Sequence, residues 1–456
     1  MKRLQHKDVS TMNQTPSIAG MSADRTSGDS IGRSDRTPTG RTHAGRTPKL
    51  DYAQTFSIGF GFLAISAAWA LYNAYVPIKL KDLMLPTAVV GMIMGIDNFC
   101  GFTIQPLFGI LSDKVRTRWG RRLPFALISI PLGALFLVLI SLAPNVPLTV
   151  AAIVAYALVM ATSRAPIVAL MPDVTDSRLR SKANGIINFM GSIGNVVALA
   201  GGSLLYKRFG MSAAFVAGAL VMVTAITALM HLVREHEEFV TKPGEKARLP
   251  FVSWTEFRNA VAPRLELDRE GRRSLALILL VLFLYTMGGN AVETYFTLYA
   301  THDLGMEAAV AGGNLVWYAV GMFAFAIPAG IIGSRFGRKV TMSAGLVLSA
   351  VLFAPMPWLG RPFMVPYLAF VFGVFWILVI VNALPWITEL GGLEHTGAMT
   401  SYYYLATSFG AAISPTIFGL IQQATGSYRW MFIYAVVLFA LALSCMPFIT
   451  RGEAAD

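Results

Sequence analysis

A short basic segment at residues 112–122 lies between two long apolar runs, residues 88–111 and 123–143. Each run has the ~20 mostly apolar residues that a membrane-spanning helix needs. The segment holds charged side chains that would be costly in hydrocarbon, namely Asp113, Lys114, Arg116, Arg118, Arg121 and Arg122. This pattern predicts two membrane helices joined by a tight turn, and the excess of Lys and Arg predicts that the turn is cytoplasmic.

The whole chain is too apolar for a soluble globular protein. Of its 456 residues, 55% are hydrophobic and 14% are charged, whereas soluble domains carry ~25% charged residues. The net charge of +12 could suit a nucleic acid, but most Lys and Arg fall in the segments expected to be cytoplasmic, so we expect no nucleic-acid partner. Cys100 and Cys445 lie within apolar runs, which predicts neither a disulfide nor a metal site.

Apolar runs of spanning length recur in two groups of six, so the sequence predicts an all-α membrane protein with twelve transmembrane helices. The first residues are rich in Ser, Thr, Gly and Arg and cannot bury enough surface to fold. We expect them to form a disordered cytoplasmic tail, with attraction to anionic lipid as the alternative. The expected domains are a tail (1–50), a first bundle (51–233), a cytoplasmic linker (234–274), a second bundle (275–450) and a cytoplasmic tail (451–456).

The second group of helices repeats motifs of the first. Residues 109–113 and 119–122 (GILSD and WGRR) are matched by residues 330–334 and 336–339 (GIIGS and FGRK), where Ser334 replaces Asp113. Both copies join the second and third helix of their half. Two six-helix repeats are typical of an alternating-access carrier whose site lies near the midplane between the halves.

The chain resembles the major facilitator superfamily, and more narrowly its glycoside/pentoside/hexuronide cation symporters and the plant sucrose/proton symporters. The resemblance covers residues 54–449 and is most specific in the motif Gln105-Pro106-x-x-Gly109-x-x-Ser112-Asp113-x-x-x-Thr117-Arg118-x-Gly120-Arg121-Arg122-x-Pro124-Phe125. It implies a gate made of Asp113, Arg118, Gly120, Arg121 and Arg122, in which Asp113 faces the start of the eleventh helix near Gly397. The alternative is a solvated basic loop that only sets orientation.

Asp97 lies about halfway along its predicted helix, where an unpaired charge costs at least ~2.5 kcal/mol and a functional role is the default. The melibiose-type relatives carry an acidic pair in this helix that binds sugar and sodium. The resemblance puts Gly101 and Gln105 at those positions, so we expect proton coupling through Asp97 in place of sodium coupling. The alternative is a structural carboxylate bonded to Asn98.

Arg164 is the basic residue placed inside a predicted span. Sucrose-type carriers have an Arg-Ala pair on this fourth helix, so the resemblance implies that Arg164 binds the sugar. Its planar guanidinium suits vicinal hydroxyls or a carboxylate. The acid that the family carries five residues later is missing, because residue 169 is Ala. Arg164 could instead extend to the cytoplasmic edge beside Asp173 and Asp176.

Further polar residues are expected to line the cavity. Asn290 and Glu293 are three residues apart in the seventh helix and share a face, and Glu293 is a second candidate for proton coupling. The alternative is that Glu293, which lies nearer the outer end of the helix, is only solvated. Asn73 and Asn382 complete the expected substrate-binding set. Aromatic candidates for stacking on a sugar are Trp376, Trp386 and Tyr403.

We therefore expect a monomeric secondary active transporter in the cell membrane, a proton-coupled symporter of a sugar or glycoside such as a disaccharide, with no cofactor and both termini cytoplasmic. An exporter of drugs or metabolites with the same fold is the main alternative, and a non-transporting sensor is another. The sequence has no phosphate-binding glycine loop, nucleophile elbow or His/Cys metal motif, so an enzyme is not expected.

Overall fold

The computed structural model describes residues 50–175, 180–233, 240, 252–261, 267–391 and 396–451. All helices described below belong to residues 48–456, which form one compact unit. The predicted tail over residues 1–50 lies outside the described residues apart from Leu50, and so does much of the predicted linker over residues 234–274.

The described residues contain 12 helical segments that are long and apolar enough to cross a membrane, which confirms the predicted twelve-helix fold. The first six consist of α1 (Tyr52–Asp82), α2 and α3 (Thr87–Met94 and Ile96–Lys114), α4 (Leu123–Leu142), α5 (Val146–Val174), α6 and α7 (Arg180–Val196 and Gly202–Phe209) and α8 (Met211–Leu232). The second six consist of α10 (Arg269–Leu298), α11 and α12 (Ala308–Gly313 and Leu315–Phe336), α13 and α14 (Arg338–Phe353 and Met356–Leu359), α15 (Val365–Gly391), α16 (Thr396–Thr425) and α17 (Trp430–Cys445).

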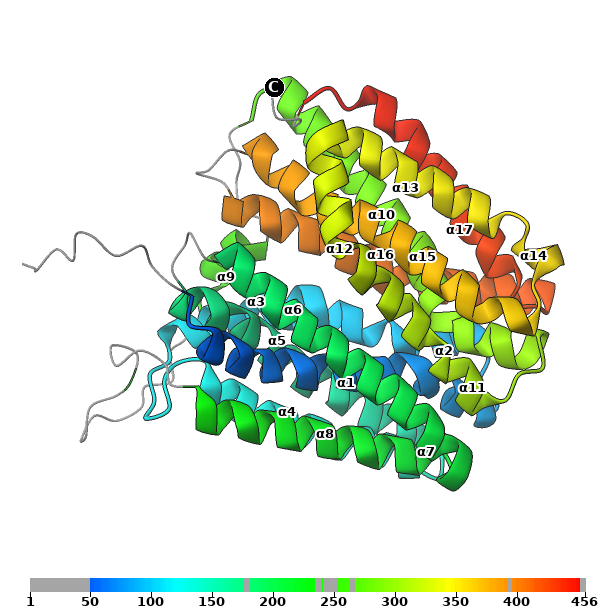
Figure 1. Ribbon diagram of the computed structural model, residues 1–456, viewed down its shortest axis with the longest axis horizontal. Coiled ribbons are helices and arrows are strands. Elements are labelled where there is room, and N and C mark those ends of the chain that lie inside the picture. The colour runs from blue at the N-terminus through cyan, green and yellow to red at the C-terminus, as the bar shows by residue number, and fades with distance from the viewer. Residues whose placement is uncertain are drawn as a thin grey trace, which may run out of the picture. The chain divides into compact units, whose positions relative to one another are not determined.

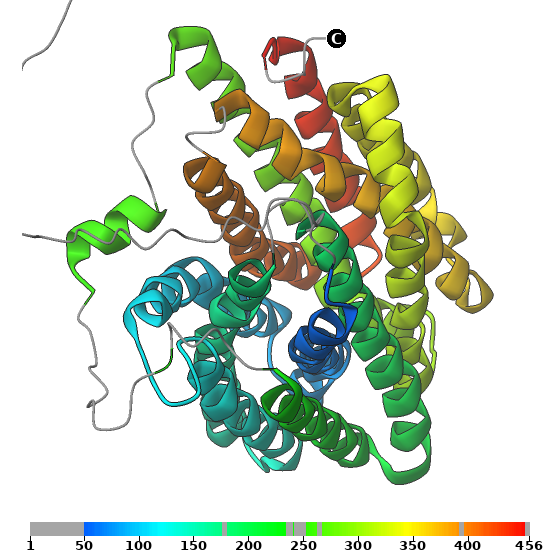
Figure 2. The ribbon, with the colours of Figure 1, turned by 60° about the vertical axis from the view of Figure 1, so that its left-hand side comes forward.

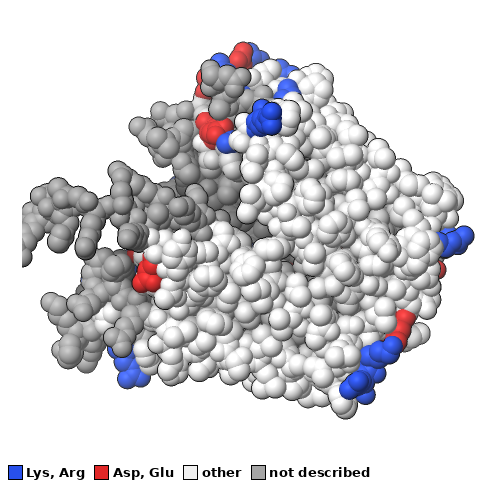
Figure 3. All heavy atoms as spheres, in the orientation of Figure 1, with Lys and Arg blue, Asp and Glu red and all other residues white. Residues whose placement is uncertain are grey.

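Each group of helices packs mainly on itself. In the first, α1 lies against α6 and α8, and α4 lies against α5 and α8; in the second, α12 lies against α15, and α10 lies against α16 and α17. Figures 1 and 2 show the first group, coloured blue to green, and the second group, coloured light green (α10) to red, as neighbouring bundles. In the view of Figure 3 the described charges lie at the ends of the helices, and the surface between them is uncharged, as a chain surrounded by lipid requires.

The two bundles touch most closely where α2 meets α16. A Cβ added at Gly91 would lie 2.2 Å from the carbonyl oxygen of Pro415, and one added at Gly95 would lie 2.3 Å from that of Ala412. The Tyr295 hydroxyl lies 2.9 Å from the Thr87 carbonyl oxygen and 2.7 Å from the Pro415 carbonyl oxygen. Backbone contact between the bundles at this place therefore depends on glycine.

The second span of each half is interrupted. Gly95 separates α2 from α3, and Asn314 separates α11 from α12, at corresponding places in the two halves. The sequence analysis treated both spans as continuous helices. The break at Gly95 places Asp97 in the first turn of α3, where the helix dipole favours a negative charge.

The predicted linker contains a short helix, α9 (Trp254–Val261), which lies against α3 and α16. A capping box begins it, because the backbone N–H of Ser253 donates to Glu256 at 2.9 Å and the backbone N–H of Glu256 lies 3.2 Å from the Ser253 hydroxyl. Lys114 at the end of α3 donates to the same carboxylate at 2.6 Å. That hydrogen bond, with those from Ser253, lowers the pKa of Glu256 to about 2.

Candidate transport site

A hydrogen bond joins the two halves in the C-terminal part of α1 and of α10. Asn73 of α1 donates from Nδ2 to Oε1 of Glu293 in α10, at 3.1 Å. Both residues were expected in the substrate-binding set, and they are 220 positions apart in the sequence. Because the two groups belong to different bundles, a relative movement of the bundles would break or remake this bond.

Asp97 is part of the same polar region. Its carboxylate interacts electrostatically with Glu293 of α10 and with Arg164 of α5. Asn98 donates to Oδ1 of Asp97 at 3.0 Å, so the bond to Asn98 that was weighed as a structural alternative is present. The structure thus brings Asn73, Asp97, Arg164 and Glu293 together from α1, α3, α5 and α10.

Arg164 has an exposed side chain although it lies well inside α5. Among the described residues it forms no hydrogen bond or ion pair, so its five N–H donors are available to a ligand. Asp173, which was considered as its partner at the membrane edge, binds Arg121 and Arg122. Asp176, the other acid considered, lies outside the described residues.

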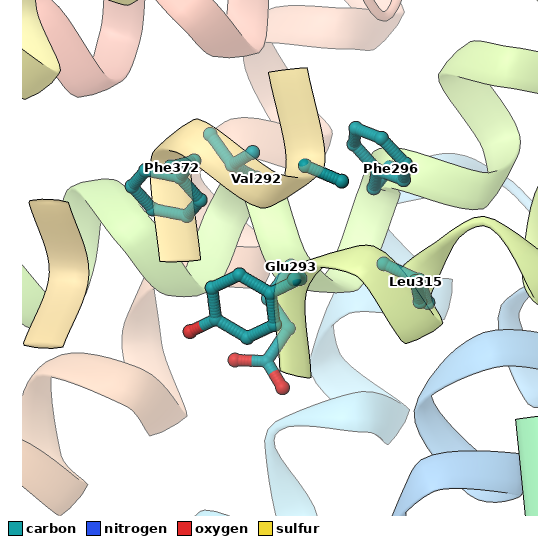
Figure 4. A pocket seen from close by; sticks show the side chains of 7 residues that line it. Val292, Glu293, Phe296, Leu315 and Phe372 are labelled. Carbon is teal, nitrogen blue, oxygen red and sulfur yellow. The ribbon is translucent and has the colours of Figure 1, made fainter. Parts of the chain in front are cut away.

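Glu293 lines a small pocket inside the second bundle, with about 250 Å³ of empty space. Its other lining residues are apolar or aromatic: Val292, Phe296, Leu315, Tyr318, Ala369 and Phe372. In Figure 4 the carboxylate points away from Val292, Phe296 and Phe372. The acid therefore faces Asn73 and the other bundle, and rings of the second bundle lie behind it.

Other predicted site residues make contacts within the second half. Asn290 accepts a hydrogen bond from Thr294 on its own helix, at 3.4 Å. Asn382 is buried, and its amide nitrogen donates to the carbonyl oxygens of Ala329 and Leu378 at 3.1 and 2.8 Å. Binding roles for these two residues stay predictions.

All three aromatic candidates are used in packing. Tyr403 is 7% exposed and meets the Tyr404 ring edge-on, with centroids 5.1 Å apart. Trp376 stacks on Tyr285 with ring centroids 4.6 Å apart. Trp386 is 1% exposed. The aromatic residues that lie beside Asp97 are different ones, Tyr72 and Tyr156, which interact electrostatically with it. The sequence analysis missed them because α1 and α5 are apolar on every side and show no periodic face that would single out one residue.

The hairpin between α3 and α4 is built around Arg122, which is only 5% exposed. Arg122 forms an ion pair with Asp113, donates to the Ser112 hydroxyl, and donates to Asp173 of α5 at 2.9 Å. Arg121 also binds Asp173, at 2.7 Å. That Asp113 faces the eleventh helix stays a prediction, and the structure adds Asp173 to the cluster.

Gly120 and Arg118 have local roles in the same hairpin. Gly120 has a φ of +104°, a value that a residue with a side chain rarely adopts, and it exchanges backbone hydrogen bonds with Thr117 at 3.1 and 3.0 Å. This geometry agrees with the expected tight turn. Arg118 is exposed and lies over the Trp119 ring at 4.1 Å.

The second half repeats the arginine–acid pair in a simpler and more exposed form. Arg338, which matches Arg121 in the repeat, pairs with Glu389 at the end of α15. Glu389 occupies the place that Asp173 has at the end of α5. The repeat in the sequence offered this signal, because an acid follows the fourth helix in each half at a similar distance.

These observations describe a twelve-helix carrier with a polar region shared by two bundles, and comparison with known proteins agrees. The family model of the Major Facilitator Superfamily matches residues 58–315 and 278–455 of the chain. The chain belongs to the major facilitator superfamily. The predicted family is thereby confirmed, and so is the expectation that the protein is a transporter and not an enzyme.

Individual relatives differ in what they carry. The chain is 24% identical over 407 residues to the isoprimeverose transporter of Lactiplantibacillus pentosus, covering 83% of this chain and 81% of that protein. It is 23% identical over 388 residues to the class C tetracycline resistance protein of Escherichia coli, covering 82% and 91%. The solved nucleoside transporter NupG matches with a TM-score of 0.69 at 13% identity, covering 87% of this chain and 100% of that chain, which shows the shared fold.

Proposed function

We propose that this protein is a proton-coupled symporter of a sugar or glycoside. The observation that carries the proposal is the polar region shared by the two bundles, where Asn73 binds Glu293 and where Asp97 interacts with Arg164 and Glu293. Acids within a membrane span are typical of proton relays, and a guanidinium with unused donors suits hydroxyl groups or a carboxylate. The similarity to the isoprimeverose transporter supports a glycoside as the substrate.

Proton coupling is favoured over sodium coupling by the residues of α3. Gly101 and Gln105 occupy the positions where sodium-coupled relatives are expected to have acids, and neither carries a charge. A hard cation needs a set of several oxygen ligands, in which carboxylates are common, whereas a single intramembrane carboxylate such as Asp97 can bind and release a proton. In this proposal, Asp97 on α3 and Glu293 on α10 are the two acids that bind and release the coupled proton.

The proposal is tested by uptake into proteoliposomes. A panel of disaccharides and glycosides is offered under an imposed pH gradient or an imposed sodium gradient. We expect the pH gradient to drive uptake and Asp97→Asn to abolish pH-driven accumulation while substrate exchange survives. Uptake that is driven by sodium alone would contradict the proposal.

Arg164→Ala separates substrate recognition from coupling in the same assay. We expect it to abolish substrate binding, with Arg335→Ala as a matched control because Arg335 is exposed in the last turn of α12 and lies over the Phe336 ring. If Arg164→Ala binds substrate with unchanged affinity, Arg164 is not part of the site.

The second candidate function is export of a drug or metabolite. It is supported by the similarity to the tetracycline resistance protein and by the apolar lining beside Glu293. Measurements of tetracycline accumulation and glycoside uptake in cells that express the protein distinguish export from symport. A lower accumulation of tetracycline, with no uptake of any glycoside, would favour export.

A further inference from the structure

Three hydrogen-bond donors are buried beside the candidate site and have no partner among the residues that the structure describes: Trp69 Nε1, Tyr72 Oη and Tyr156 Oη. Tyr72 and Trp69 lie on α1 and Tyr156 lies on α5. The two tyrosine rings stack with centroids 5.1 Å apart, and the Trp69 ring meets them edge-on at 5.5 and 5.7 Å. Proteins rarely leave several adjacent donors unpaired, so we expect an acceptor for them in another state of the carrier.

Asp97 is a charged acceptor close to both tyrosines. Its carboxylate interacts electrostatically with Tyr72 and with Tyr156, and α5 lies against both α1 and α3. Its one hydrogen bond from a side chain among the described residues comes from Asn98 to Oδ1. An ionised carboxylate has about four acceptor positions, so Oδ2 retains capacity for both hydroxyls.

We propose that Tyr72 and Tyr156 are positioning residues for Asp97, whose ionised carboxylate accepts hydrogen bonds from both hydroxyls and whose protonated form leaves them unpartnered. Donors that bind the ionised form make that form more favourable. The two tyrosines would thereby help Asp97 to release its proton. The proposal extends the coupling role proposed for Asp97. Its transport measurement rests on that role, whereas its labelling measurement does not.

Other groups act on Asp97 from the surrounding helices. Arg164 faces it from α5, Glu293 from α10, and Cys100 from its own helix α3. The α2 helix has no titratable residue, and α16 approaches α3 with Ser408 and Ala412. None of these neighbours changes when a tyrosine hydroxyl is removed, so tyrosine-to-phenylalanine variants isolate the proposed bonds.

The test measures protonation of Asp97 directly. A carbodiimide reacts with protonated buried carboxyls, and mass spectrometry of the purified full chain gives the labelled fraction at Asp97 as a function of pH. We expect Tyr72→Phe and Tyr156→Phe each to move the midpoint of labelling upward by about one pH unit, the size of one charge-assisted hydrogen bond. The pH of half-maximal uptake should move in the same direction.

Tyr75→Phe is the matched control. Tyr75 is also a buried tyrosine of α1 without a hydrogen-bond partner, but it interacts with Tyr206 and Ser203 instead of Asp97. Its replacement should leave the midpoint unchanged. All three variants should fold, because each removes a hydroxyl that has no partner in this state.

Two outcomes would overturn the proposal: a midpoint unchanged in both Tyr72→Phe and Tyr156→Phe, or an equal shift in Tyr75→Phe. If the carbodiimide does not reach Asp97, the midpoint of its protonation can be measured by infrared difference spectroscopy of the protonated carboxyl band. Asp97→Asn is then the blank. Labelling does not require transport. If the midpoint shifts but a pH gradient drives no uptake, the proposed function fails and the role of the tyrosines stands.

Discussion

Arg122 shows how a single buried charge can organise a loop. A buried ion is costly unless its hydrogen-bond donors are used, and Arg122 uses them on Asp113, Ser112 and Asp173. Through Asp173 the guanidinium connects the α3–α4 hairpin to the end of α5. Arg118, four residues earlier, is exposed and touches only its neighbour Trp119 in the contacts described. Two arginines in one basic motif therefore have different physical roles.

Replacing Arg122 should destabilise the protein more than replacing Arg118. Arg122→Ala leaves Asp173 with one of its two arginine partners, and breaking a buried pair costs ~3–5 kcal/mol. Arg118→Ala removes an exposed contact worth ~0.5–1 kcal/mol. Thermal unfolding in detergent, followed by intrinsic fluorescence, measures both. Equal melting temperatures for the two variants would show that Arg122 is not the centre of the cluster.

At the scale of the element, α2 and α16 can approach because glycine lies on the contact. Gly91→Ala would place a methyl group against the Pro415 carbonyl and the Tyr295 hydroxyl. We expect a loss of ~1–3 kcal/mol in the free energy of unfolding and slower transport, because the two bundles would be held apart. Melting temperature and initial uptake rate are the measurements.

Gly201→Ala is the control for Gly91→Ala. Gly201 also lies in a helical segment, and a Cβ there would meet no atom within 4 Å. We expect no loss of stability, since Ala is the better helix former by up to ~1 kcal/mol. If both substitutions destabilise the protein equally, close approach at Gly91 is not the cause.

The short helix α9 should detach from α3 in acid. The pKa of Glu256 is held at about 2 by its hydrogen bonds to Lys114 and Ser253, below the ~4.3 of a free glutamate. A carboxylate with a lowered pKa stabilises its contact at every pH above the unfolded value, and the contribution is lost as pH falls from about 4 towards 2. The protection factors of the α9 amides, which compare each exchange rate with the intrinsic rate at the same pH, should therefore be high at neutral pH and lower in this acidic range.

Glu256→Gln removes that pH dependence in the hydrogen-exchange experiment. The variant should exchange α9 amides faster than the original chain near pH 7, and the difference should shrink below about pH 4. Glu270→Gln is the control, because Glu270 pairs with Arg451 and lies outside α9. An unchanged exchange rate in Glu256→Gln at pH 7 would contradict the role of the ion pair.

At the scale of the whole molecule, transport by two bundles requires contacts between them that break and re-form. One such contact lies at the end of α7, where Lys207 pairs with Glu307, the residue before α11, at 3.6 Å. Nearby, the Ser203 hydroxyl donates to the Ala309 carbonyl oxygen at 2.7 Å. These contacts join the two halves at a distance from the Arg122 cluster.

A reversible cross-link at this contact should stop transport. Lys207→Cys and Glu307→Cys, combined in a chain with Cys100 and Cys445 replaced by Ala, can be joined by a short bis-methanethiosulfonate. We expect uptake to fall below a tenth of its value and to recover when the link is reduced. Each single cysteine, treated in the same way, is the control. Full uptake in the linked protein would show that the bundles do not separate here.

The sequence alone determined the number and type of elements. A run of about twenty apolar residues is a local property, and in a bilayer its backbone must form a helix. The repeated hairpin motif predicted two equivalent halves, each with a hairpin between its second and third helix. The motif of residues 105–125 is likewise contiguous in the sequence, so the family could be predicted from it without the structure.

Only the tertiary structure decided which side chains meet. Asn73 and Glu293 are bonded across 220 positions, Asp173 closes the Arg122 cluster, and Tyr72 and Tyr156 face Asp97. These neighbours depend on how each helix is rotated and where Gly95 interrupts the second span. A helix that is apolar on every side carries no periodic signal for its rotation, and packing against the other helices fixes it.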